Sequence, residues 1–195
     1  MADDNYFPMP SVTDLPSSLQ SLCGKAEAEL GFVPNVFLGY GHRPERFSAW
    51  FAHYSQLHVP TENLSAADRE MIAVVVSAIH QCTYCLVSHV HALRRELGDV
   101  ELADRIVFNW RHAGLDERRL AICAYADKLT RTPAQIGRED LESLEAVGLS
   151  SDEVWDVVEL VSMYSFTNRF SLAMGFDANP EYHYLDKPVA ERSAP

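Results

Sequence analysis

Basic residues and cysteines are scarce in this sequence of 195 residues, and long apolar runs are missing. Sixteen Lys and Arg side chains stand against 28 Asp and Glu, which gives a formal net charge of −12. A surface of that charge repels phosphate backbones and anionic headgroups, so neither nucleic acid nor a membrane surface is expected as a partner. The longest apolar run, Met71 to Ile79, is about half of the ~20 residues that a spanning helix needs.

The first twenty residues contain neither Lys nor Arg and lack the apolar stretch of a signal peptide, so a cytoplasmic location is expected. The four cysteines are too few for a disulfide scaffold. Cys23 and Cys123 each stand alone within an apolar helical pattern, which indicates buried, inert thiols. Only Cys82 and Cys85 lie close together, and in a reducing compartment such a pair is typical of catalysis or metal binding.

Strand patterns are nearly absent, whereas apolar residues recur at helical spacing along most of the chain. The pattern predicts an all-α fold with a single domain over residues 17–178, because 47% hydrophobic content suffices for one core. A proline-rich, extended arm is expected over residues 1–16 and an extended tail over residues 179–195. The predicted helices cover residues 17–30, 34–40, 43–58, 66–80, 83–97, 100–110, 116–130, 138–147 and 151–174.

The helix predicted over residues 66–80 has the clearest start. Ser65 can cap its first turn, and Asp68 stands where the acid of a capping box lies. Its interior is apolar on all sides, which predicts a central position in the fold. The helix over residues 83–97 follows closely, so the two are expected to form a central hairpin that carries both neighbouring cysteines.

Two further patterns favour structural interpretations. Arg169 stands in the apolar final helix, where a buried guanidinium needs a partner such as Asp127 or Glu159. An aromatic stripe also runs along the helix predicted over residues 43–58, and such a stripe is more often core or subunit interface than a cofactor site. Its members are Phe47, Trp50, Phe51 and Tyr54.

The strongest chemical signal is the spacing around the cysteine pair. Cys82 stands at the predicted start of a helix, where unpaired N–H groups and the helix dipole stabilise a thiolate. Cys85 follows three residues later, and His89 lies four residues beyond it on the same face. An imidazole one turn away can take the thiol proton, and the two sulfurs can be joined by a disulfide after modest adjustment.

Such a pair can reduce a peroxide, because thiolate attack on the O–O bond gives a sulfenic acid that the second thiol converts into a disulfide. The leaving oxygen needs a proton, so the site also requires a relay acid. Glu70 is the nearest upstream carboxylate on the preceding helix, and the hairpin can bring it beside the thiols. His80, Tyr84 and His91 are neighbouring side chains that can line the site.

Zinc is an alternative use of the same residues. A structural zinc site needs four ligands, and no second Cys-x-x-Cys or suitable pair of histidines completes one. In this alternative, a zinc ion would be bound by Cys82, Cys85, His89 and one further ligand. We expect no metal and no other cofactor.

Glu70, Cys82, Cys85 and His89 are separated by eleven, two and three residues, and this set resembles the signature of the alkyl hydroperoxidase D-like, or carboxymuconolactone decarboxylase-like, superfamily. The resemblance covers most of residues 15–178 and includes the segments 31–35 and 168–170, which resemble longer, peroxidase-related members. It implies an all-helical bundle that forms a homo-oligomer, with the cysteine pair near a cavity.

The resemblance also implies roles for the four residues. Cys85 would be the peroxidatic thiol and Cys82 the resolving thiol, while His89 and Glu70 would form the proton relay. The chain departs from the well-studied peroxidases of the family at Tyr84, where those proteins have a histidine. A tyrosine hydroxyl can donate a hydrogen bond, but its ordinary pKa near ~10 makes it a poor base at neutral pH.

The sequence therefore predicts a peroxidase-like thiol oxidoreductase that reduces a small hydroperoxide through a Cys82–Cys85 disulfide. An unidentified thiol or dithiol reductant would restore the pair, and the assembly is expected to be a dimer, trimer or hexamer. Two alternatives remain. One is a carboxymuconolactone decarboxylase-like enzyme that uses histidine and glutamate without thiol turnover, and the other is a non-catalytic helical protein for redox sensing or assembly.

Overall fold

The computed structural model describes residues 7–185, and over that range it contains helices and no strand. The all-α prediction is confirmed, and each predicted helix is present with ends within one residue of those expected. The α-helices are α1 (Ser17–Leu30), α2 (Asn35–Tyr40), α3 (Pro44–Leu57), α4 (Ala66–His80), α5 (Thr83–Leu97), α6 (Val100–Asn109), α7 (Glu117–Arg131), α8 (Arg138–Ala146) and α9 (Ser151–Met174). Short 3-10 helices are η1 (Val12–Asp14), η2 (Trp110–His112), η3 (Pro133–Gln135) and η4 (Pro180–Tyr184).

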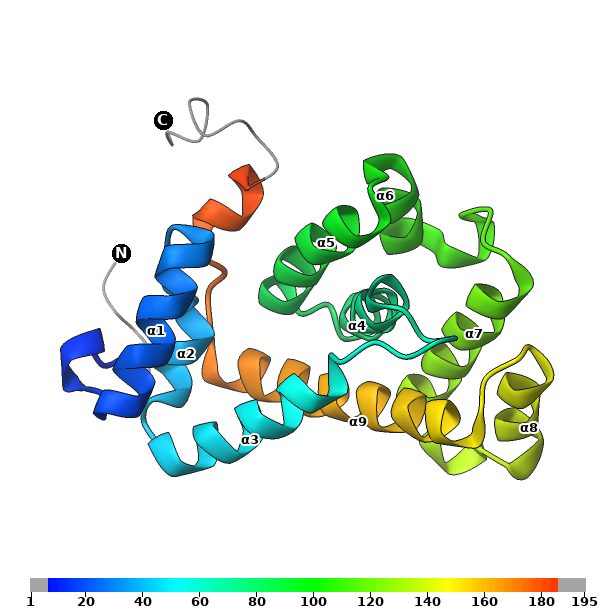
Figure 1. The fold of residues 1–195 in the computed structure, drawn as a ribbon, viewed down its shortest axis with the longest axis horizontal. Coiled ribbons are helices and arrows are strands. Elements are labelled where there is room, and N and C mark those ends of the chain that lie inside the picture. The colour runs from blue at the N-terminus through cyan, green and yellow to red at the C-terminus, as the bar shows by residue number, and fades with distance from the viewer. Residues whose placement is uncertain (1–6, 186–195) are drawn as a thin grey trace.

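Helix α4 is the centre of the molecule. Figure 1 looks almost along its axis and shows other helices around it, and α4 packs against α5, α6, α7 and α9. Its residues 67–77 are buried on every side, as expected from their apolar sequence. The predicted capping box is also present, because Ser65 Oγ accepts the Asp68 N–H at 3.2 Å and Asp68 Oδ2 accepts the Ser65 N–H at 3.0 Å.

Two charged residues in the first turn of α4 are fully buried and tie this helix to its neighbours. Asp68 pairs with Arg118 and Arg119 of α7, both at 2.9 Å. Arg69 is 1% exposed and pairs with Asp156 of α9 at 2.7 Å. A buried charge is stable only when it is paired, so these contacts fix the rotation of α4 about its axis. They thereby also fix the direction of the Glu70 carboxylate, which is the next residue.

The expectation that Arg169 is buried was wrong. Its side chain is exposed and donates to the Ser165 carbonyl oxygen of its own helix at 3.1 Å. Position 169 lies on the outer face of α9, where Phe166 and Leu172 are also exposed. Because apolar residues occur on all faces of α9, the sequence pattern did not distinguish its inner face from its outer one.

The segment after α9 is folded, in contrast to the extended tail expected from residue 179. Asn179 accepts the Asn35 N–H at 2.7 Å and donates to the Val33 carbonyl oxygen at 2.9 Å. Pro180 then begins η4, a position that proline favours, and Tyr182 of η4 is buried. Figure 1 shows η4 beside the N-terminal helices. Residues 186–195 of the predicted tail lie outside the described residues.

The predicted N-terminal arm is also partly structured. Ser11 and Asp14 form a capping box around η1, and the next residue, Leu15, is buried. This short turn packs its leucine under the N-terminal helices instead of running extended over the surface. Residues 1–6 of the arm lie outside the described residues.

The molecule has two hydrophobic cores of different composition. The first core surrounds α4 and is mainly aliphatic, with contributions from α5, α6, α7, α8 and α9. The second core joins α1, α2, α3 and η4 to the start of α5 and the end of α9, and its buried members include Phe32, Tyr40, Phe47, Cys82, Tyr84, Cys85, Phe176 and Tyr182. The cysteine pair therefore belongs to the aromatic core.

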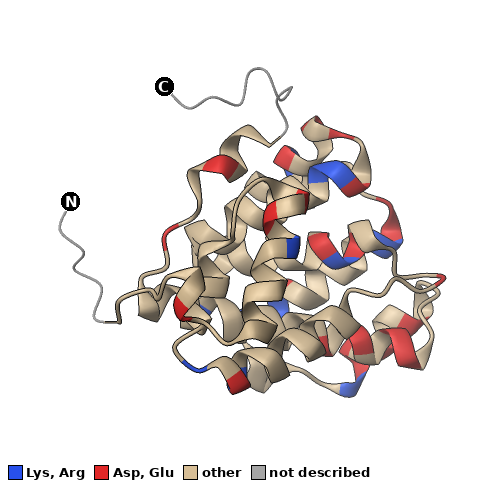
Figure 2. Ribbon diagram, turned by 60° about the vertical axis from the view of Figure 1, so that its left-hand side comes forward, with Lys and Arg blue, Asp and Glu red and all other residues tan. Residues whose placement is uncertain are grey.

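Most charged side chains are exposed or half-buried, and the buried ones among the described residues are Asp68, Arg69, Glu70, Asp127 and Glu153. Figure 2 shows acidic segments spread over the helices among fewer basic ones, in keeping with the net charge of −12. Among residues 7–185, no helix is both long and apolar enough to cross a membrane.

Candidate functional site

The turn between α4 and α5 places the two cysteines. Gln81 ends α4 in the left-handed conformation, with a φ of 56°, and Cys82 is the N-cap of α5. The Cys85 N–H donates to Cys82 Sγ at 3.4 Å, so the sulfur takes the place of a capping oxygen. Both thiols are buried and unbridged. The predicted position of Cys82 at the helix N-terminus is confirmed.

The two thiols titrate as a pair. The Cys85 thiol donates to Cys82, and this hydrogen bond outweighs burial and lowers the pKa of Cys82 to about 7. Backbone N–H groups of the first turn of α5 and the charge of His89 act in the same direction. The pKa of Cys85 is raised, because its proton is held by Cys82 and because the site is buried, while the Ser171 hydroxyl opposes this by donating to the Cys85 sulfur. The pair thus loses its first proton near neutral pH, and the negative charge then lies mainly on Cys82.

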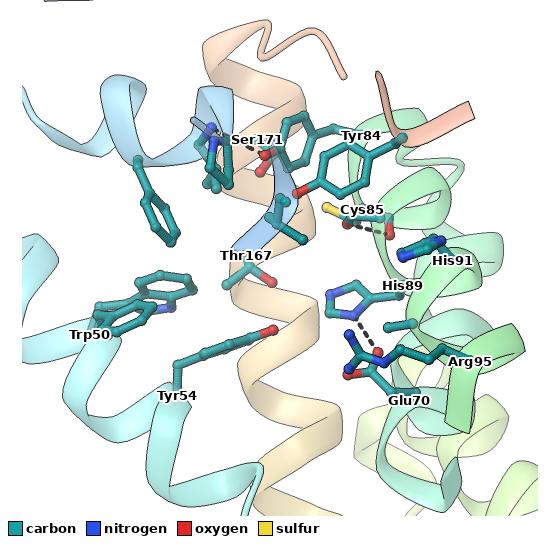
Figure 3. Close-up of a pocket in the computed structure, with 18 residues that line it drawn as sticks. Trp50, Tyr54, Glu70, Tyr84, Cys85, His89, His91, Arg95, Thr167 and Ser171 are labelled. Atoms are coloured by element: carbon teal, nitrogen blue, oxygen red, sulfur yellow. Dashed lines mark hydrogen bonds and ion pairs between the residues drawn. The ribbon is translucent and has the colours of Figure 1, made fainter. Parts of the chain in front are cut away.

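A cavity of about 230 Å³ opens beside Cys85. Cys85 and Ser171 are on its wall, whereas Cys82 lies behind Cys85 and does not line it. Figure 3 shows the Cys85 sulfur directed into the cavity, with Trp50 and Tyr54 on the opposite side. The aromatic side chains of the wall are Phe37, Trp50, Phe51, Tyr54, Tyr84 and Tyr182.

The aromatic stripe of α3 therefore has two parts. Phe47 is 1% exposed and packs within the second core, as expected for a core residue. Trp50, Phe51 and Tyr54 instead line the cavity that faces Cys85. The stripe is a wall of the site as well as a part of the core, which the helical spacing alone did not indicate.

His89 and Glu70 meet as the hairpin predicts. His89 Nδ1 lies 2.8 Å from Glu70 Oε2, and both side chains are largely buried. Burial alone would raise the pKa of Glu70, but attraction and a hydrogen bond from His89, with further attraction from Arg95, hold that pKa below its ordinary value. Figure 3 shows the His89 ring between Glu70 and Cys85. The carboxylate thus orients the imidazole from behind.

Sequence reasoning missed a second histidine at this site. His58 Nδ1 lies 2.7 Å from the Tyr54 carbonyl oxygen, which can only accept, so Nδ1 carries the proton. Burial lowers the pKa of His58, and the neutral ring therefore accepts the Tyr164 hydroxyl at Nε2, at 2.9 Å. His58 Nε2 is also 3.7 Å from Glu70 Oε1. The only sequence signal was its place four residues after Tyr54, at the end of the aromatic stripe.

Tyr84 lines the cavity, as predicted, and also braces it. Its hydroxyl accepts the Val36 N–H at 3.2 Å, and its ring meets that of Tyr182 edge to face with centroids 6.3 Å apart. Burial is the main cause that raises the pKa of Tyr84 well above its ordinary value. The hydroxyl thus stays protonated and links α5 to α2 and η4.

His80 does not line the cavity, in contrast to our expectation, whereas His91 does. His80 Nδ1 accepts the side-chain amide of Asn168 at 3.2 Å, and the Asn168 carbonyl oxygen accepts the Ser77 hydroxyl at 3.2 Å. His80 is the last residue of α4, and its side chain points toward Asn168 of α9 instead of α5. This contact accounts for the polar, buried Asn168 in the segment 168–170.

No group of three or more His, Cys, Asp or Glu side chains within residues 7–185 is arranged to hold a metal ion. Cys82 is directed toward Cys85 and His89 toward Glu70, so the four ligands that zinc requires do not converge.

Known proteins resemble this chain in sequence and fold. Residues 44–127 match the carboxymuconolactone decarboxylase family. An uncharacterized peroxidase-related protein from a Silicibacter species is 36% identical, with a TM-score of 0.86 over 93% of this chain and 95% of that one. A peroxidase-related protein with an alkylhydroperoxidase AhpD core from Ralstonia eutropha is 30% identical, with a TM-score of 0.88 over 94% of this chain and 97% of that one.

A more distant similarity is to Sestrin-2 of Mus musculus, which is 28% identical over 170 residues. That match covers 85% of this chain but 33% of Sestrin-2, so the chain spans about a third of the length of that relative. The two peroxidase-related structures, in contrast, match this chain almost end to end. The chain therefore belongs to the alkyl hydroperoxidase D-like, carboxymuconolactone decarboxylase superfamily.

Proposed function

We propose that this protein reduces organic hydroperoxides through a dithiol–disulfide cycle of Cys82 and Cys85, with His89 and Glu70 as the proton relay. The observation that carries the proposal is the position of Cys85. Its sulfur faces a cavity into which the His89 ring also projects, and a second thiol with a pKa of about 7 lies directly behind it.

The first step is attack by Cys85, the thiol on the cavity wall. Its proton passes to the Cys82 thiolate along the hydrogen bond between them, and Ser171 donates to the sulfur that becomes negative. The Cys85 thiolate then attacks the outer oxygen of the hydroperoxide, so that an S–O bond forms and the O–O bond breaks. The leaving alkoxide takes a proton from the His89 imidazolium and departs as an alcohol.

The second step consumes the resolving thiol. Neutral His89 now accepts the Cys82 proton, directly or through water, and the Cys82 thiolate attacks the Cys85 sulfenic sulfur. An S–S bond forms, the S–O bond breaks, and the departing hydroxide regains the proton from His89 to give water. In total, two thiols and one hydroperoxide give a disulfide, an alcohol and water.

An external thiol or dithiol then reduces the Cys82–Cys85 disulfide by exchange. Such a reductant would attack Cys85, the one cysteine of the pair on the cavity wall. We further propose that the protein works in the cytoplasm as a homo-oligomer.

The test is rapid mixing of the reduced protein with cumene hydroperoxide, followed by mass spectrometry. We expect a Cys82–Cys85 disulfide and equimolar cumyl alcohol within one turnover. Cys85→Ser should form neither product, whereas Cys82→Ser should stop at the sulfenic acid, which dimedone traps. Cys123→Ser, at a buried cysteine of the first core, is the matched control and should react like the wild type.

Two results would contradict the proposal. Absence of the disulfide at millimolar hydroperoxide would remove peroxide reduction as the activity. Turnover of a lactone or another small molecule by the Cys82→Ser, Cys85→Ser double variant would instead favour acid–base chemistry by His89 and Glu70 without thiol turnover.

A further inference from the structure

The cavity beside Cys85 is larger than hydrogen peroxide requires, and its lining is mostly apolar with one arginine. We propose that it binds organic hydroperoxides with an apolar body and a carboxylate, and that Arg95 recognises the carboxylate. This inference rests on the proposed function, because it names the substrate class of the same site.

The size and lining of the cavity support an apolar body. Its volume of about 230 Å³ exceeds by far the space of a molecule with only two oxygen atoms. The wall opposite Cys85 consists of Trp50, Phe51 and Tyr54, whose ring faces suit a flat or branched hydrocarbon group. A substrate that fills this space displaces water from around the thiol, which hydrogen peroxide alone cannot do.

Arg95 supplies the positive charge. It is the one Arg or Lys among the described residues that line the cavity, and the one carboxylate there, Glu70, is already engaged by His89. Figure 3 shows the Arg95 guanidinium beside His89 and Glu70, on the cavity side of α5. A guanidinium at the edge of an apolar cavity is well suited to bind a carboxylate with two parallel hydrogen bonds.

The present partner of Arg95 is easily replaced. Arg95 pairs with Glu96, its neighbour in sequence, at 2.9 Å, and the Arg95 side chain is 58% exposed. Exposed pairs of this kind contribute only about 0–1 kcal/mol, because solvent screens them. A substrate carboxylate held in place by the cavity therefore competes well with Glu96.

Arg95 also lies where the second end of a bound substrate would emerge. An outer groove shares Leu30, His91 and Arg95 with the cavity, so these three residues form the mouth. Glu29 and Arg94 lie farther out in the groove, one of each sign, so Arg95 sets the permanent charge at the mouth.

The distance along α5 fits a substrate of defined length. Ten residues separate Cys85 from Arg95, which is ~15 Å of helix rise, and the arginine side chain reaches back toward the helix N-terminus. A benzene ring with a hydroperoxide group at one end and a carboxylate at the other is shorter than this rise, and the backward reach of the arginine side chain covers the remainder. The probes are therefore cumene hydroperoxide with a para-carboxylate and the methyl ester of the same compound.

The experiment measures kcat/KM for both probes with the wild type and three variants. For the wild type, we expect the acid to exceed the ester by about tenfold, as one charge-assisted contact predicts. Arg95→Gln should bring the ratio of acid to ester close to one, and Arg95→Lys should keep part of the preference. Using the ratio cancels any effect of Arg95 on Glu70, because that effect applies to both probes.

Arg105→Gln is the matched control, since Arg105 is also 58% exposed and paired with a glutamate, but lies on α6 away from the cavity. It should keep the wild-type ratio. Equal kcat/KM for acid and ester in the wild type, or an undiminished preference in Arg95→Gln, would overturn the inference and leave the proposed function intact. Failure of the wild type to reduce either probe would instead overturn the proposed function.

Discussion

Asp68 and Glu70 lie two residues apart on α4, and both are buried, but they face different regions and different partners. Asp68 points toward α7, where two arginines hold it and where it also caps its own helix. Glu70 points toward α5 and α3, where it pairs with His89 and lies near His58. Guanidinium groups do not lose their protons at physiological pH, whereas imidazoles can.

The different partners of Asp68 and Glu70 mark two regions of the molecule, a structural region around Asp68 and a reactive region around Glu70. The Asp68 network borders the aliphatic first core, where the Cys123 thiol is buried and its pKa is raised mainly by that burial. The Glu70 network borders the aromatic second core, which contains the cavity and the cysteine pair. Helix α4 thus directs Asp68 toward permanently charged arginines on one side and Glu70 toward a titratable histidine on the other.

The largest effect is expected when the structural network is broken. Asp68→Asn should lower the free energy of unfolding by about 2–4 kcal/mol, because two arginines lose their buried anion. Chemical denaturation followed by circular dichroism measures this change. Glu142→Gln, which removes an exposed ion pair with Arg138, should cost less than about 0.5 kcal/mol. A similar loss in both variants would contradict the division of the molecule into these two regions.

Asp68→Asn also tests how the free energy of unfolding depends on pH. Burial raises the pKa of Asp68, but hydrogen bonds from Arg118, Ser65 and Arg119 outweigh it and hold the pKa below the ordinary value of 3.8. The resulting stability is fully present above that ordinary value and is lost as the pH falls through the lower, folded-state pKa. Asp68→Asn should therefore show a smaller decline in stability below about pH 4 than the wild type.

Glu70→Gln should have the opposite effect, with a large loss of activity and a small loss of stability. The amide can still accept a hydrogen bond from His89 but no longer stabilises its imidazolium, so hydroperoxide reduction should fall by about 100-fold or more. The free energy of unfolding should change by no more than about 1 kcal/mol. Single-turnover rates and denaturation curves measure the two quantities, with Glu101→Gln on the surface of α6 as control. A large loss of stability with normal turnover would assign Glu70 to the structural region.

The thiol pair gives a third test of the reactive region. Ultraviolet thiolate absorbance should show one ionisation near pH 7, since the pKa of Cys82 is lowered to about 7. Cys85→Ala removes the hydrogen bond that is the main cause, so the remaining pKa should rise toward the ordinary value of 9.0. Cys123→Ser should leave the titration unchanged. A pKa that stays near 7 without Cys85 would point to the helix terminus as its main cause.

Much of this arrangement was predictable because its determinants are local. The capping box of Ser65 and Asp68, the helix start at Cys82 and the return of α5 along α4 all depend on residues near one another in sequence. The meeting of Glu70 and His89 follows from that hairpin and needed no knowledge of the remaining chain.

The rest of the site depends on contacts between distant segments. His58 directly follows α3, Ser171 belongs to α9 and Tyr182 to η4, and their meeting depends on how these elements cross α4 and α5. The sequence also did not distinguish the faces of α9, so Arg169 was expected inside, whereas the arginine that is buried among residues 7–185 is Arg69. Helical periodicity identifies a buried face only when the opposite face is polar.

Ser171→Ala tests one contact between segments that are distant in sequence, and its expected effect is the smallest. Its hydroxyl donates to the Cys85 sulfur, so its loss should slow single-turnover reduction by about tenfold or less, the value of one hydrogen bond to a thiolate. Ser162→Ala, an exposed serine of α9 that bonds to its own helix, is the matched control and should have no effect. If the slower rate returns to the wild-type value at higher pH, Ser171 stabilises the Cys85 thiolate; a defect that is constant with pH would assign it to packing of the cavity wall.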